Sequence, residues 1–86
     1  MTVIYPRQGS EVFIPNDLGR QREKLVLEVA HRERDEVLYW HLNGQYLGQT
    51  ETFHQLPLDL PQGEYQLQVE DQSGHVAKVD FSVVSE

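Results

Sequence analysis

The chain has 86 residues, a formal net charge of −7 at pH 7 and no cysteine. Its length fits a single domain over residues 1–86, near the lower limit of what one hydrophobic core supports. Without cysteine, neither a disulfide nor a thiolate zinc site can stabilise the fold. The acidic charge argues against nucleic acid as a partner, because phosphate binding needs a basic surface. No apolar run approaches the roughly 20 residues of a membrane span, so we expect no membrane contact by these residues.

In chain order, the residue pattern predicts short β-strands throughout. Strands are expected at residues 2–5 and 12–14, and the proline that follows each one favours a position at the edge of a sheet. Alternating apolar and polar residues predict further strands over residues 24–31 and 36–42.

A hairpin is predicted immediately after this fourth strand. Asn43 and Gly44 separate two apolar runs, and both residues tolerate the positive φ angles of a type I′ turn. The return strand begins near Tyr46. Residues 49–62 are expected to be irregular, with four apolar anchors in the core: Phe53, Leu56, Leu58 and Leu60. Two regular strands, 63–71 and 75–84, close the chain.

About seven short strands predict an all-β fold, and three details favour an immunoglobulin-like β-sandwich. Leu27, Trp40 and Leu67 follow the order and approximate spacing of the Cys, Trp and Cys of antibody domains, with leucines replacing the disulfide. Tyr65 precedes Leu67 by two residues, as in a tyrosine corner, and its hydroxyl is expected to bond the backbone near Leu60. We therefore expect Leu27, Trp40, Tyr65 and Leu67 in the structural core; a small β-barrel is the alternative fold.

The residues offer no catalytic machinery. No serine begins an S-x-x-K motif or lies in a G-x-S-x-G motif, and there is neither a P-loop nor a G-x-G-x-x-G sequence. Glu51, Asp59, Glu64 and Asp71 border turns, where a structural role is the more common one. We predict a non-catalytic domain with no catalytic residue and no cofactor.

Four histidines, His31, His41, His54 and His75, are well separated along the chain. None makes an H-x-x-x-H or similar ligand pair. The expectation is therefore that they are isolated surface residues and that the domain holds no metal.

A possible binding face follows from the alternation of side chains along strands. If Trp40 points inward, Tyr39 and His41 point outward, and Gln66 and Gln68 can lie on the same outer sheet face. A surface of tyrosine, histidine and glutamine could bind a glycan or a partner protein. The alternative is that these are ordinary exposed side chains of the kind found on any surface.

Several motifs resemble the C-terminal domain of bacterial penicillin-binding protein 1C, and together they span residues 4–83. Residues 4–10 are similar to its I-x-x-P-x-x-G start, although Ile4 is one residue closer to Pro6 than in that pattern. Residues 40–48 are similar to its W-x-x-[ND]-G-x-x-L-G hairpin. Residues 61–74 fit its P-x-G-x-[YH]-x-L-x-V-x-D-x-x-G run, and residues 81–83 resemble its closing strand.

Proteins of that family are bifunctional peptidoglycan glycosyltransferases and transpeptidases anchored in the inner membrane. The resemblance implies a periplasmic, immunoglobulin-like module at the end of such a protein, with a role in cell-wall synthesis and none of the parent's active-site residues. Its expected partners are the parent's catalytic domains or another envelope protein. Peptidoglycan, bound through the Tyr39 and His41 face, is the alternative partner, and a stand-alone cytosolic adaptor is a third reading.

Overall fold

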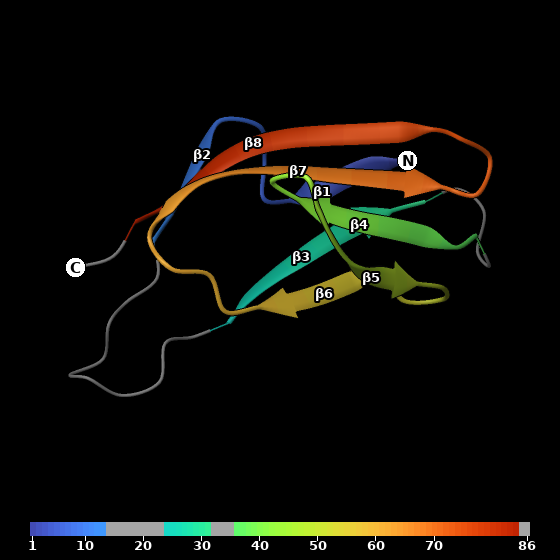
Figure 1. Cartoon of the computed structure of the whole chain (residues 1–86), viewed down its shortest axis with the longest axis horizontal. Helices are drawn as coiled ribbons and strands as arrows, with labels where there is room; N and C mark the ends of the chain where they lie inside the picture. Colours follow the sequence, from blue (N-terminus) through green and yellow to red (C-terminus); the bar gives the residue numbers. More distant parts are fainter. Residues whose placement is uncertain (14–23, 32–35, 85–86) are drawn as a thin grey trace.

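The computed structural model describes residues 1–13, 24–31 and 36–84, which form eight β-strands (Figure 1). In chain order the strands are β1 (Thr2–Tyr5), β2 (Ser10–Phe13), β3 (Leu25–Ala30), β4 (Leu38–Leu42), β5 (Gln45–Thr50), β6 (Gln55–Leu58), β7 (Gly63–Asp71) and β8 (Val76–Val84). Within these residues there is no helix long and apolar enough to cross a membrane.

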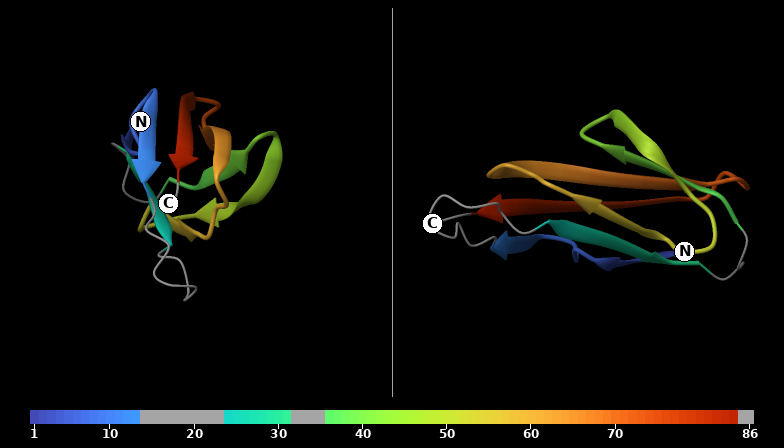
Figure 2. Two further views of the ribbon diagram at one scale, coloured as in Figure 1. Left: turned by 90° about the vertical axis from the view of Figure 1, so that its left-hand side faces the viewer. Right: turned by 90° about the horizontal axis from the view of Figure 1, so that it is seen from below.

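The strands form two sheets that pack face to face, as the two further views in Figure 2 show. One sheet has three strands in the order β1-β3-β6, and the other has five in the order β2-β8-β7-β4-β5. β2 runs parallel to β8, and every other neighbouring pair is antiparallel. The predicted all-β, immunoglobulin-like sandwich is confirmed.

The sequence expectation that β1 and β2 lie at sheet edges is confirmed, and two expectations about residues 49–62 are wrong. β1 and β2 lie at sheet edges, as the prolines after them predicted. The stretch expected to be irregular contains β6, which pairs with β3 and tolerates Pro57 because it is an edge strand. Phe53 is not a core anchor: it lies in the bend between β5 and β6, and 83% of its surface is exposed.

The core lies between the sheets and is built by the inward residues of both. Leu27 on β3, Trp40 on β4 and Leu67 on β7 are all fully buried. The disulfide of antibody domains is thus replaced by aliphatic side chains from opposite sheets, packed with the tryptophan in one cluster.

The predicted hairpin between β4 and β5 is confirmed. Asn43 and Gly44 have φ angles of 50° and 80°, as a type I′ turn requires. The pairing register shifts between Trp40 and His41, so that Gly48 lies opposite Trp40 and Tyr46 lies opposite His41. Tyr46 is placed beside His41 by the turn itself, and the bulge beyond this pair leaves Leu47 as the extra residue of β5.

The tyrosine corner also forms. The Tyr65 hydroxyl donates a hydrogen bond of 2.6 Å to the carbonyl oxygen of Pro61, one residue beyond the predicted Leu60. The Tyr65 ring stacks on Phe81 of β8, with the ring centroids 5.6 Å apart. The hydrogen bond from Tyr65 to Pro61 therefore ties the connection that precedes β7 to the first turn-proximal residues of β7.

A short polar chain leads from the core indole to a buried histidine. Trp40 Nε1–H donates to Thr50 Oγ1 at 2.9 Å, and the same hydroxyl lies 2.8 Å from Nδ1 of His54. Only 8% of the His54 surface is exposed. Burial, with a smaller effect of the nearby His31, lowers the pKa of His54 below its ordinary value. The lowered pKa favours the neutral imidazole, which suits a hydrogen-bonding role within the fold.

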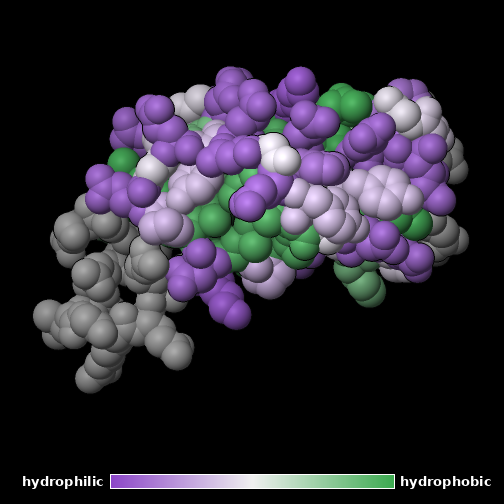
Figure 3. Space-filling model, viewed as in Figure 1, coloured by the Kyte–Doolittle hydropathy of each residue, from purple (hydrophilic) through white to green (hydrophobic). Residues whose placement is uncertain are grey.

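Part of the core reaches the surface at one side of the sandwich. Figure 3 shows apolar side chains exposed over the space between β7 and β6. Half-buried apolar residues that pack against the core include Leu47, Leu56 and Leu58. The edge strands β5 and β6 thus leave the core only partly covered on this side.

Removal of the Trp40 side chain should cost about 3–5 kcal/mol of unfolding free energy, as for other buried aromatics. That is a large part of the total stability of a small domain. We expect Trp40→Ala to show a much lower urea midpoint than the wild type, or no folded state, in circular dichroism. Phe53→Ala, which truncates an exposed ring, should stay close to the wild type. Near-wild-type stability of Trp40→Ala would contradict the core assignment.

Candidate functional site

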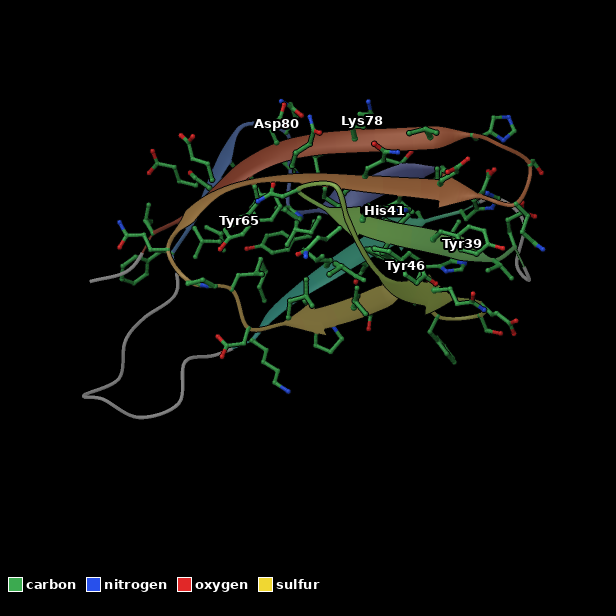
Figure 4. All side chains as sticks on the ribbon, viewed as in Figure 1. Tyr39, His41, Tyr46, Tyr65, Lys78 and Asp80 are labelled. Carbon is green, nitrogen blue, oxygen red and sulfur yellow. The ribbon has the colours of Figure 1, made fainter. Side chains whose placement is uncertain are left out.

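The outer face of the five-stranded sheet brings together side chains from four strands in one row. Cross-strand pairing places Lys78 of β8 beside Gln68 of β7, Gln68 beside His41 of β4, and His41 beside Tyr46 of β5. The rings of His41 and Tyr46 lie 5.4 Å apart at a tilt of 60°. Figure 4 shows this pair close to Tyr39, with Lys78 projecting from β8. We call these five residues, Tyr39, His41, Tyr46, Gln68 and Lys78, the aromatic row.

The members of the aromatic row differ in exposure. Tyr46 is 57% exposed, whereas Tyr39, His41 and Gln68 are half-buried by their neighbours. Nδ1 of His41 is buried and has no hydrogen-bond partner among the described residues. Because the backbone beneath is paired on both sides at β7 and β4, the row stands on the interior of a sheet and not on a loop.

A polar hollow adjoins the aromatic row on the same face. Its polar lining includes Asn43, Glu64, Gln66, Asp80 and Ser82. Asn43 Oδ1 accepts a hydrogen bond of 2.8 Å from the backbone N–H of Gln66, and Gln66 Nε2 donates to Asp80 Oδ1 at 3.2 Å. These hydrogen bonds thus connect the β4–β5 hairpin to β7, and β7 to β8, across the hollow.

Residues near the amino terminus complete this hollow. Gln8 Oε1 accepts a hydrogen bond of 3.0 Å from the backbone N–H of Asp80, and Gln8 Nε2 donates to Asp80 Oδ2 at 3.3 Å. The backbone N–H of Gly9 donates to the carbonyl oxygen of Asp80 at 2.7 Å. Asp80 is therefore oriented from both sides, with its carboxylate held at the surface.

The four residues proposed as a binding face share the outer face of one sheet. Gln68 lies directly opposite His41, and Tyr39 lies on the same strand two residues earlier. Gln66 lies two residues before Gln68 on β7, opposite Asp80, in the hollow and not in the aromatic row.

Sequence reasoning missed three residues of this surface: Tyr46, Lys78 and Asp80. The signal for Tyr46 was present in the Asn43-Gly44 turn, since a two-residue turn places Leu42 opposite Gln45 and hence His41 opposite Tyr46. Lys78 and Asp80 alternate with the inward residues of β8 and could have been found by the same parity.

A second polar cluster lies at one end of the sandwich, where the β3–β4 and β7–β8 connections meet. Asp71 is 3% exposed, and its Oδ2 lies 3.0 Å from His31 Nε2 and 3.1 Å from His75 Nδ1. Its Oδ1 accepts hydrogen bonds from the backbone N–H groups of Ser73 and His75, at 3.0 and 2.8 Å. The carboxylate thereby closes the β7–β8 turn.

These contacts alter the acidity of Asp71. Burial alone would raise its pKa, but hydrogen bonds from His31 and from the backbone and ring of His75 outweigh this effect and lower the pKa to about 2. Asp71 is therefore a carboxylate at every pH near neutrality.

The expectation of isolated surface histidines is wrong for His31 and His54, which are covered, and His75 is exposed but not isolated, because its ring contacts Asp71. His54 is buried beside Thr50, and the His31 side chain is only 7% exposed and contacts Asp71. Both residues lie just outside strands, where alternation along the sequence does not predict burial; the tertiary fold covers them. The His75 side chain is 75% exposed, as expected for a residue at a turn.

Two sheets in this order, a buried tryptophan and a tyrosine corner define the chain as an immunoglobulin-like β-sandwich domain. A model of the Penicillin-Binding Protein C-terminus Family matches residues 1–81. The chain belongs to this family, which places it in the context of bacterial cell-wall synthesis. No curated protein and no solved structure matches it.

Acid should destabilise the domain through Asp71. Its pKa in the folded state is about 2, below the ordinary 3.8, so its stabilising contribution is present above about pH 4 and is lost as the pH falls toward 2. We expect Asp71→Asn to be less stable than the wild type at pH 7 and to lose less stability between pH 4 and 2. Urea unfolding at a series of pH values measures both. Equal losses in the two proteins would show that Asp71 does not have this role.

Proposed function

We propose that the chain is the non-catalytic C-terminal accessory domain of a bifunctional penicillin-binding protein, a peptidoglycan glycosyltransferase and transpeptidase. In this proposal the parent is anchored in the inner membrane and the domain acts in the periplasm. It docks through its aromatic row onto a protein surface, which is either a catalytic domain of the parent or another envelope protein. The observation that carries the docking proposal is the Lys78-Gln68-His41-Tyr46 row.

The composition of the aromatic row suits a protein interface. Tyrosine is enriched at such interfaces because its rigid ring buries a large area while its hydroxyl still bonds. Tyr46 offers an exposed ring beside His41, so that a partner could cover both rings together. Truncation of a central aromatic commonly costs more than 1 kcal/mol in binding.

Charge indicates the kind of surface that the domain would meet. The chain carries a net charge of −7. The acidic residues on or beside the outer face include Glu64, Glu70 and Asp80, and Lys78 lies on the same face. A basic protein surface therefore complements this face better than the anionic stem peptides of peptidoglycan do.

The polar hollow supports a second candidate function, the binding of glycan. Carboxylate and amide groups of Asp80, Gln66 and Asn43 converge there, next to exposed rings on which a sugar could stack. Binding in this mode would be centred on Gln66 and Asp80, and not on Tyr46.

Nuclear magnetic resonance titration distinguishes these functions. The isotopically labelled 86-residue chain is titrated separately with the catalytic domains of its parent protein and with peptide-free glycan strands. Docking predicts amide shifts at Tyr39, His41, Tyr46 and Gln68 with the protein. Tyr46→Ala, which removes an exposed ring, should weaken this binding about fivefold or more.

Phe53→Ala is the matched control, because it removes another exposed ring that lies away from the outer face. It should bind as the wild type does. Shifts confined to the three-stranded sheet, or equal affinity of Tyr46→Ala and the wild type, would contradict docking through the aromatic row. Shifts at Gln66 and Asp80 with glycan alone would establish the second function in its place.

A further inference from the structure

We propose that His31, Glu36 and Asp71 form a binding site for one divalent transition-metal cation, with Zn²⁺ the best suited, and that His75 supplies a further ligand. The site lies at the end of the sandwich where the β3–β4 and β7–β8 connections meet. It is separate from the aromatic row and independent of the proposed docking function.

The distances between the candidate ligand atoms fit a small cation. One ligand atom each from His31, Glu36 and Asp71 lies within 4.8 Å of the other two. Nε2 of His31 is 3.0 Å from Asp71 Oδ2, and Nδ1 of His75 is 3.1 Å from the same oxygen. Zinc bonds to nitrogen and oxygen measure about 2.0–2.2 Å, so neighbouring ligands of a tetrahedral site lie about 3.3 Å apart. Small movements of the side chains would lengthen these two contacts enough for a cation to bind between the ligand atoms.

Both carboxylates are positioned by the same turn. Asp71 Oδ1 accepts the backbone N–H groups of Ser73 and His75, which directs Oδ2 toward the two imidazoles. Glu36 Oε1 accepts the backbone N–H of Ser73 at 3.2 Å and its hydroxyl at 3.1 Å. Hydrogen bonds of this kind orient ligands around metal ions in proteins. The acidic ligands are thus held in place before any cation binds.

Charge and burial favour a cation at this point. Asp71 is ionised at neutral pH, its side chain is only 2% exposed, and Glu36 is half-buried nearby. A cation bound between the two carboxylates would offset their mutual repulsion. A mixed nitrogen and oxygen ligand set is one that Zn²⁺ accepts. The exposed side chain of His75 leaves a route from solvent.

The proposal departs from the sequence expectation that the domain holds no metal. His31 and Glu36 flank one connection and Asp71 and His75 flank another, so the site joins two segments that are distant in sequence. The pairing of β4 with β7, which places Leu38 opposite Asp71, brings Glu36 to the β7–β8 turn. No ligand spacing along the chain could show this arrangement.

Calorimetric titration of untagged, chelator-treated protein with ZnCl₂ tests the site. We expect saturable binding of one Zn²⁺ per chain and a rise of about 5 °C in the melting temperature at saturation. Replacement by Co²⁺ should give the intense visible absorption of a four-coordinate site with nitrogen and oxygen ligands. Absence of saturable binding at neutral pH would overturn the proposal.

Two variants separate a metal site from a purely structural cluster. Glu36→Gln keeps an oxygen that can accept the Ser73 hydrogen bonds but removes the charge, and His75→Gln removes an exposed imidazole. Each should retain the folded spectrum of the wild type and bind Zn²⁺ tenfold more weakly or worse. His41→Gln, which removes a histidine elsewhere, should keep the wild-type affinity for Zn²⁺. Unchanged affinity in Glu36→Gln, or an equal loss in His41→Gln, would contradict the assigned ligands.

Discussion

The fully buried indole of Trp40, whose Nε1–H donates to Thr50 Oγ1 at 2.9 Å, fixes the register of β4 between β5 and β7. Because side chains alternate along a strand, an inward Trp40 requires Tyr39 and His41 to face outward. A slip of one residue would exchange the two faces and expose the indole. The hydrogen bond to Thr50 also ties β5 to this register, and with it Tyr46. The outer face of the sheet therefore depends on one buried side chain.

Much of this arrangement could be predicted from the residues, because it follows from local rules. Asn43-Gly44 determines the hairpin, and parity along β4 and β7 puts Tyr39, His41 and Gln68 on one face. The eighth strand, β6, could not be seen, since its short run contains a proline that only an edge position tolerates. The environments of His31 and His54 were also beyond prediction, because they arise where segments distant in sequence meet.

The aromatic row and the polar cluster around Asp71 lie in different parts of the domain. The aromatic row lies on paired strands in the interior of a sheet, and its side chains point outward. Within the row, the rings of His41 and Tyr46 contact each other. The cluster lies at a turn, where Asp71 already organises the backbone. Membership of the Penicillin-Binding Protein C-terminus Family gives both features a setting in cell-wall synthesis.

The most direct test of this account measures the environment of the single tryptophan in the chain. Hydrogen exchange of the Trp40 indole N–H, followed by nuclear magnetic resonance at neutral pH, reports its burial and its bond to Thr50 together. A buried, hydrogen-bonded indole predicts exchange slower than that of a free indole by several orders of magnitude, limited by opening of the sandwich. Exchange at the rate of a free indole would show that Trp40 faces water. In that case β4 would have the opposite register, and Tyr39 and His41 would lie in the core.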